Sequence, residues 1–194
     1  TARFAGFLQQ HLPGCRFVFM VRDPRDVAAS YLATDGIPGG VERAVDVWIA
    51  DQTDNLALWQ LSSEQTLYHL RYEDLLADAQ GSLAPVTSFL GLNYSSTMLD
   101  FHGDDRTRRN AQRQSLMPAE IEYIELRCHF LMQAFGYSPD IVIKRPDDPE
   151  IVRRCALLQP ELREGNYRIG TAAEIEIRKR RLAMIDTVKA RRLV

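Results

Sequence analysis

The chain has 194 residues, 45% of them hydrophobic, and a formal net charge of −2. This length and hydrophobic fraction predict one packed domain, or one domain with an appendage, and argue against a disordered chain. The slightly acidic charge argues against a general nucleic-acid-binding protein, which would carry excess positive charge. Because no apolar run approaches the roughly 20 residues of a membrane-spanning helix, a membrane protein is not indicated either.

The first residues predict a helix that is already under way. The chain begins at Thr1 without an initiator methionine, and apolar residues recur at helical spacing over 3–12 until Pro13-Gly14 ends the pattern. We therefore expect further sequence upstream of this chain. No signal-like segment stands at the start, although a targeting segment could lie upstream. The three scattered cysteines are interpreted as reduced thiols of a cytoplasmic protein.

A strand, a turn and a helix are predicted in direct succession between residues 16 and 32. Residues 16–21 form a continuous apolar run rich in β-formers, which predicts a buried strand of a parallel sheet. Asp23 can cap the next helix, and Pro24 suits the first turn of that helix. We expect the helix to continue to about Leu32.

The rest of the chain alternates between helical and extended patterns. Apolar periodicity predicts helices over 41–61, 83–90 and 121–135, the last two ended by Gly91 and Gly136. A second strand is expected over 66–71, with a loop or short helical turn at 72–76. Residues 102–115 are polar and arginine-rich, residues 139–149 are proline-rich, and the last 45 residues have mostly helical patterns.

Strands that alternate with helices indicate an α/β domain with a parallel sheet. We assign residues 1–145 to this domain and residues 146–194 to a helical C-terminal extension. Only two strands are clear, which is few for such a sheet, so the chain is expected to form the later part of a larger fold. Its three cysteines, Cys15, Cys128 and Cys155, form no Cys-x-x-Cys pair, so neither a metal site nor a disulfide framework is expected.

The end of the first strand is a candidate anion site. Arg22 follows the strand directly, and its guanidinium can make two parallel hydrogen bonds to a phosphate at the carboxyl edge of the sheet. Ser30 lies eight residues later on the next helix and can add a hydroxyl donor. In the alternative interpretation, Arg22 pairs with Asp23 or Asp26 and Ser30 is a small packing residue. The residue types and their spacing leave both interpretations open.

The same stretch resembles a motif of a known enzyme family. Residues 22–27, Arg-Asp-Pro-Arg-Asp-Val, with Ser30 eight positions after the arginine, look like the second donor-binding motif of sulfotransferases. Further family-like features follow in the expected order: Trp48, the segment 70–75, the segment 89–92 and the helix that closes with 135–137. The resemblance covers about residues 3–137 and implies a P-loop NTPase-like parallel sheet flanked by helices.

The resemblance also implies a reaction and a set of binding residues. Sulfotransferases move a sulfuryl group from 3′-phosphoadenosine 5′-phosphosulfate (PAPS) to an acceptor hydroxyl or amine and release adenosine 3′,5′-bisphosphate (PAP), without a metal. The family pattern implies that Arg22 and Ser30 hold the 3′-phosphate and that Tyr72 lies near the adenine. Arg106 and Arg109 belong to a basic loop that would fold over the donor; a solvated charged loop is the alternative.

Two further features bear on the sulfotransferase resemblance: an acidic pair after the second strand, and the lack of a glycine-rich loop. Glu73 and Asp74 are expected to cap the next turn or to orient basic groups. Family members begin with a glycine-rich, P-loop-like segment that cradles the phosphosulfate, and this sequence shows no such loop. The glycine cluster at 36–40 is interpreted as a turn. The catalytic base stays unassigned, because the one histidine before Arg22, His11, lies in a helix-to-strand turn.

Three functions are carried forward. The first is a PAPS-dependent sulfotransferase with a small-molecule, glycan or lipid acceptor, where the activity of this chain alone is left open. The second is a nucleotide-binding, P-loop kinase-like phosphotransferase. The third is a degenerate, non-catalytic domain that acts through its basic C-terminal helix, where residues 178–194 hold seven Lys or Arg against one Asp. We expect that helix to pack on the domain or on a second copy, forming a homodimer, in preference to a membrane or an acidic partner.

Overall fold

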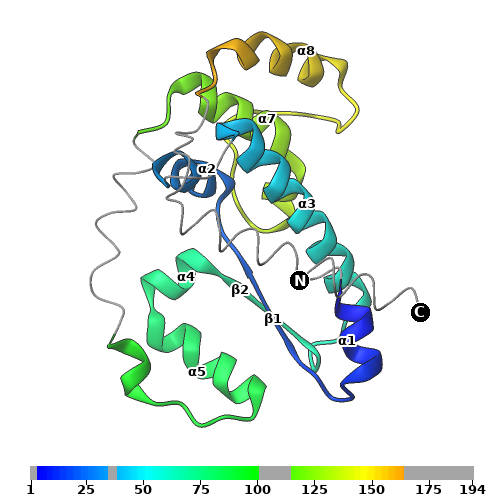
Figure 1. Ribbon diagram of the computed structural model, residues 1–194, viewed down its shortest axis with the longest axis vertical. Helices are drawn as coiled ribbons and strands as arrows, with labels where there is room; N and C mark the ends of the chain where they lie inside the picture. Colours follow the sequence, from blue (N-terminus) through cyan, green and yellow to red (C-terminus); the bar gives the residue numbers. More distant parts are fainter. Residues whose placement is uncertain (1–3, 35–38, 101–114, 164–194) are drawn as a thin grey trace, which may run out of the picture.

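The computed structural model describes residues 4–34, 39–100 and 115–163, and two parallel strands lie at its centre (Figure 1). β1 (Phe17–Val21) pairs with β2 (Leu67–Arg71), and the register places Val21 opposite Arg71. Because the strands are parallel, their carboxyl ends lie at the same edge of the sheet. The predicted α/β class with a parallel sheet is confirmed.

The helices occupy the segments where apolar periodicity predicts them. The short segment after β2, predicted as a loop or a helical turn, forms a six-residue helix. The bounds are α1 Ala5–His11, α2 Pro24–Ala33, α3 Gly40–Leu61, α4 Tyr72–Ala77, α5 Ala79–Leu90, η2 Ser96–Leu99, α7 Pro118–Ala134, α8 Pro149–Leu158 and η3 Gln159–Glu161.

The ends of three helices follow from the predicted capping residues. The Asp23 side chain accepts a hydrogen bond of 2.9 Å from the Arg25 N–H and so caps α2, with Pro24 as the first helical residue. Gly91 ends α5 with φ 73°, and Gly136 follows α7 with φ 75°. Glycine suits both positions because other residues rarely adopt this left-handed conformation.

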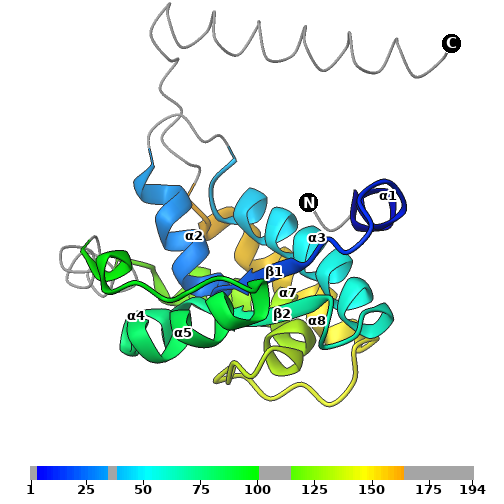
Figure 2. The same cartoon turned by 90° about the horizontal axis from the view of Figure 1, so that it is seen from below.

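Helices cover the two faces of the sheet unequally. In Figures 1 and 2 the strands lie between α3 and α7 on one side and α4 and α5 on the other. His69 of β2 contacts the rings of Trp59 and Phe135 on the first side, and Tyr68 contacts Phe89 of α5 on the second. The core lies on the α3 and α7 side, where its largest fully buried apolar residues are Ile124, Met132, Val21, Val41 and Val45.

The expectation of a strand buried on both faces is wrong for β1. Phe19 and Val21 are buried against the core, whereas Val18 is 39% exposed and Met20 is 46% exposed. Side chains alternate between the faces of a strand, so these two point to the opposite side. Within the described ranges α5 packs beside β2, and this side of β1 stays partly open.

The segment after residue 145 is joined to α7 by ion pairs. Arg154 of α8 pairs with Glu122, and the Arg163 Nε donates to Glu120 Oε1 at 2.7 Å. Burial alone would raise the pKa of Glu120, but hydrogen bonds from Arg163 and from the Met117 N–H lower it. The division of the chain at 145/146 stays a prediction, and the basic segment 178–194 lies outside the described residues. No described helix is long and apolar enough to cross a bilayer.

A histidine is buried inside α7, and no described residue forms a hydrogen bond with its side chain. His129 is 2% exposed, and neither of its ring nitrogens has a partner among the described residues. Its ring meets Phe130 edge-on, with 4.9 Å between the ring centroids. Burial lowers the pKa of His129, and the charge of Glu125 opposes this shift only in part. Burial therefore disfavours the charged form of this imidazole in the folded state.

The buried imidazole should make the stability of the protein depend on pH. Since the pKa of His129 is lower in the folded state, the unfolded chain binds the proton first as the pH falls below about 6.5. The free energy of unfolding should fall between pH 7.5 and pH 5.5, by at most about 1.4 kcal/mol per pH unit for one proton. His129→Leu should reduce this pH dependence in urea unfolding, and His11→Gln, at an exposed position, should not. An unchanged pH dependence in His129→Leu would contradict this account.

Candidate functional site

The parallel register brings together two residues that lie fifty positions apart in the sequence. Arg22 directly follows β1 and Tyr72 directly follows β2, so both stand at the carboxyl edge of the sheet. The guanidinium carbon of Arg22 lies 4.9 Å from the centroid of the Tyr72 ring. This edge is where ligands bind in open α/β sheets. Arg22 and Tyr72 thus lie side by side. The resemblance implied that Arg22 holds the 3′-phosphate and that Tyr72 lies near the adenine of the same nucleotide.

The Arg22 side chain is not neutralised by any carboxylate among the described residues. Its Nε is buried and has no hydrogen-bond partner there. The Asp23 carboxylate is bound by Arg25 instead, at 3.0 Å to Nε and 2.7 Å to Nη2. The structure therefore does not support the interpretation in which Arg22 pairs with Asp23. A buried donor that lacks a partner is uncommon in folded proteins and is compatible with a site for an anionic ligand.

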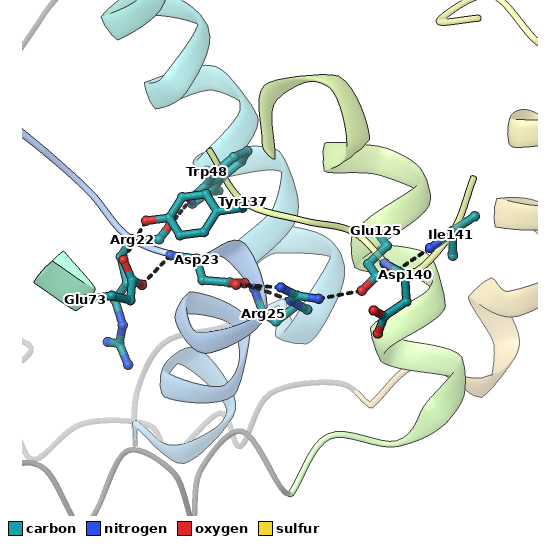
Figure 3. A network of polar contacts seen from close by, with 9 residues as sticks. All are labelled: Arg22, Asp23, Arg25, Trp48, Glu73, Glu125, Tyr137, Asp140 and Ile141. Carbon is teal, nitrogen blue, oxygen red and sulfur yellow. Dashed lines mark hydrogen bonds and ion pairs between the residues drawn. The ribbon is translucent and has the colours of Figure 1, made fainter. Parts of the chain in front are cut away.

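The backbone at Arg22 is held from two sides (Figure 3). The Trp48 indole N–H donates to the Arg22 carbonyl at 2.9 Å, and the Asp23 N–H donates to Glu73 Oε1 at 2.9 Å. These two groups belong to the same peptide unit. The other oxygen of Glu73 accepts a hydrogen bond of 2.7 Å from the Tyr137 hydroxyl. Burial, together with the bond to Glu73, raises the pKa of Tyr137, so the phenol stays protonated.

A buried ion network fixes the start of α2 against α7. Arg25 is 8% exposed and bridges Asp23 to Glu125, whose Oε1 lies 2.7 Å from the Arg25 Nη1. The second oxygen of Glu125 accepts from the backbone N–H groups of Asp140 and Ile141, at 2.9 and 3.1 Å. Burial alone would lower the pKa of Arg25, but the hydrogen bonds and charges of both carboxylates raise it. Figure 3 shows the network as a continuous chain of contacts beside Arg22.

Sequence reasoning assigned no role to Arg25 or Glu125, and it left the role of Glu73 general. The signal for Glu125 is its position: it lies four residues after Ile121 and three before Cys128, inside the apolar stripe of the helix. A carboxylate at such a position needs a buried partner. Arg25 carried no comparable signal, because Asp23-Pro24-Arg25 also suits an ordinary exposed helix start.

The structure does not bring the remaining predicted site residues together with Arg22 and Tyr72. Ser30 is half-buried on α2, and its carbonyl accepts from the Thr34 hydroxyl at 2.7 Å. Its own hydroxyl makes no hydrogen bond with a described residue, Arg22 included. Arg106 and Arg109 lie outside the described residues. The ligand contacts of all five candidate residues, Arg22, Ser30, Tyr72, Arg106 and Arg109, stay predictions.

Comparison with known proteins supports the resemblance to sulfotransferases. Residues 1–96 match the model of the sulfotransferase family. These residues are just under half of the chain. The matched range contains both strands and the helices α2 to α5, and therefore includes Arg22, Ser30 and Tyr72. A search of curated proteins found no significant match.

Two solved sulfotransferase domains are similar in structure. One is the sulfotransferase domain of the Synechococcus PCC 7002 olefin synthase, with 18% identity and a TM-score of 0.49 over 63% of this chain and 50% of that one. The other is the sulfotransferase domain of the curacin biosynthetic pathway, with 18% identity and a TM-score of 0.41 over 81% of this chain and 56% of that one. The chain thus spans about half the length of these two domains.

Proposed function

We propose that this chain supplies the 3′-phosphoadenosine side of the donor site in a PAPS-dependent sulfotransferase. One observation carries the proposal: Arg22 stands at the carboxyl edge of a parallel sheet with no carboxylate partner among the described residues and with its Nε buried and unpaired. An arginine left in this state can still form the paired hydrogen bonds that a phosphate accepts. The family match supports the choice of PAPS as the ligand.

The neighbouring groups fit the same ligand. The Tyr72 ring supports the Arg22 guanidinium at 4.9 Å and offers an aromatic surface beside it, which suits an adenine next to a 3′-phosphate. From the family resemblance we assign Ser30, Arg106 and Arg109 to the same donor; the two arginines lie outside the described residues. The donor would bring a sulfuryl group, which leaves a phosphate oxygen and bonds to an acceptor oxygen or nitrogen as that atom loses its proton. The residues of this chain would bind and orient the non-reacting end.

Two nucleotides that differ only in the 3′-phosphate test the assignment of Arg22. We expect adenosine 3′,5′-bisphosphate to raise the melting temperature of the full chain clearly more than 5′-AMP does. Arg22→Ala should remove most of this difference, because hydrogen bonds to a charged partner contribute about 1.5–3 kcal/mol, or roughly tenfold or more in affinity. Arg16→Ala is a matched control, since Arg16 lies at the other end of β1, with its guanidinium carbon 5.7 Å from the Phe89 ring centroid.

The outcomes separate the candidate functions. Equal stabilisation by the two nucleotides in the wild type would overturn the assignment and favour a kinase-like nucleotide site. No stabilisation by either would favour a non-catalytic domain. A difference that survives in Arg22→Ala would move the 3′-phosphate contact to another residue. The acceptor, whether small molecule, glycan or lipid, is a separate question for the complete enzyme.

A further inference from the structure

We infer that Glu73 is a positioning residue: together with Trp48 it clamps the peptide unit between Arg22 and Asp23 and so directs the Arg22 side chain toward the donor 3′-phosphate. The inference rests on the proposed function for its ligand, but the clamp itself is a feature of the protein alone. Glu73 does not touch the donor in this account. Its effect reaches the donor through Arg22.

The peptide unit between Arg22 and Asp23 is held on both of its sides. A peptide is planar, and its carbonyl and N–H groups point in opposite directions. The carbonyl of Arg22 is bound by Trp48 from α3, and the N–H of Asp23 is bound by Glu73 from α4, each at 2.9 Å. Two bonds on opposite sides of one plane restrict its rotation. The direction in which the Arg22 side chain leaves the backbone is thereby restricted as well.

The Glu73 side chain is itself held in place. Its two oxygens accept from different donors, Asp23 N–H with one and the Tyr137 hydroxyl with the other. Tyr137 is 5% exposed, and the Arg71 guanidinium carbon lies 4.5 Å from its ring centroid. The Glu73 carboxylate therefore links the segment after α7 to the end of β1 through these two hydrogen bonds. A side chain bound at both oxygens cannot turn aside to neutralise Arg22.

The Arg22 side chain is ordered but carries no ion pair with a described carboxylate. In Figure 3 its guanidinium points away from the Asp23–Arg25–Glu125 network. It lies against the Tyr72 ring, and its buried Nε has no hydrogen-bond partner in the part of the chain that the structure describes. A cation ordered before the ligand arrives loses less conformational entropy on binding. The clamp should thus favour the nucleotide that carries a 3′-phosphate over the one that lacks it.

The test measures a preference rather than a single affinity. The dissociation constants of adenosine 3′,5′-bisphosphate and 5′-AMP are measured by calorimetry on the full chain, and their ratio reports the 3′-phosphate contact. Glu73→Ala should reduce this preference severalfold, with the 5′-AMP affinity almost unchanged. Glu73→Gln should keep most of the preference, because its amide oxygen can accept from the Asp23 N–H and its amide N–H can donate to the Tyr137 oxygen. A residue that only stabilised the fold would weaken both nucleotides and leave the ratio as it is.

Matched variants and a ligand-free measurement complete the design. Asp74→Ala removes an exposed carboxylate from the same helical turn and should keep the preference. In the free protein, amide hydrogen exchange at Asp23 should accelerate in Glu73→Ala and stay at the wild-type rate in Asp74→Ala. Should Glu73→Ala fail to fold, Tyr137→Phe takes its place, because it frees one carboxylate oxygen and should lower the preference to an intermediate value.

The possible failures are distinguishable. A wild type that prefers adenosine 3′,5′-bisphosphate, with a Glu73→Ala that keeps the full preference, overturns the positioning role and leaves the proposed function intact. Unchanged exchange at Asp23 in Glu73→Ala also overturns the clamp. A wild type without any preference overturns the proposed function, and the positioning role with it.

Discussion

Arg25→Met is expected to lower the free energy of unfolding by about 3–5 kcal/mol, the usual cost of removing one partner from a buried ion network. Arg25 is the shared partner of Asp23 and Glu125, and side-chain exposures of 10%, 4% and 1% leave these three groups little contact with water. Methionine fills much of the same volume but donates no hydrogen bond. Two buried carboxylates would then lose their countercharge together. Urea unfolding of the variant at pH 7.5 measures the loss.

Two further variants define the cause of that loss. Arg153 pairs with Glu150 on the surface of α8, and Arg153→Met should have little effect, because exposed ion pairs contribute little to stability. Arg25→Lys keeps the charge but not the planar set of donors that reaches both carboxylates, so it should lie between wild type and Arg25→Met. Wild-type stability in Arg25→Met would show that the network contributes nothing to folding.

Trp48→Ala should be comparably destabilising, by about 3–5 kcal/mol, because it empties a large volume in the core. Trp48 is 3% exposed, lies on α3 in the main apolar cluster, and binds the Arg22 carbonyl through its indole N–H. Trp48→Phe keeps most of the packing and loses the hydrogen bond, so a smaller cost of about 1–3 kcal/mol is expected for the carbonyl left without its donor. Urea unfolding of the two variants separates the packing from the hydrogen bond.

The second tryptophan of α3 provides a control within the same helix. Trp59 is 42% exposed and stacks on His69, with 4.9 Å between the ring centroids. Trp59→Ala should therefore cost clearly less stability than Trp48→Ala, although both variants remove the same side chain from one helix. Equal losses would contradict the assignment of Trp48 to the core that supports Arg22.

The features that the sequence predicted well depend on local chemistry. Asp23 before Pro24 marks a helix start, Gly91 and Gly136 mark helix ends, and a run of apolar β-formers marks β1. Each of these signals acts over a few neighbouring residues, so it can be recognised without knowledge of the fold. The position of Arg22 at a strand end follows from the same local pattern.

The features that could not be predicted depend on contacts between distant segments. Arg25 and Glu125 are 100 residues apart, and Asp23 and Glu73 are 50 apart, so only the packing of α2, α4 and α7 reveals these pairs. The exposure of Met20 was missed for a related reason. An apolar run predicts a strand, but which of its faces is covered depends on the elements that pack beside it.

Because β1 and β2 are paired in a fixed register, the number of residues in β1 is constrained. Side chains alternate along a strand, so adding or deleting one residue between Phe17 and Val21 would turn every later side chain to the opposite face. Arg22 would then leave the Tyr72 ring, although no residue of the pair had changed. Substitutions within β1 can be absorbed by repacking, whereas changes in its length cannot. Natural variation in this strand is therefore expected in residue type and not in residue number.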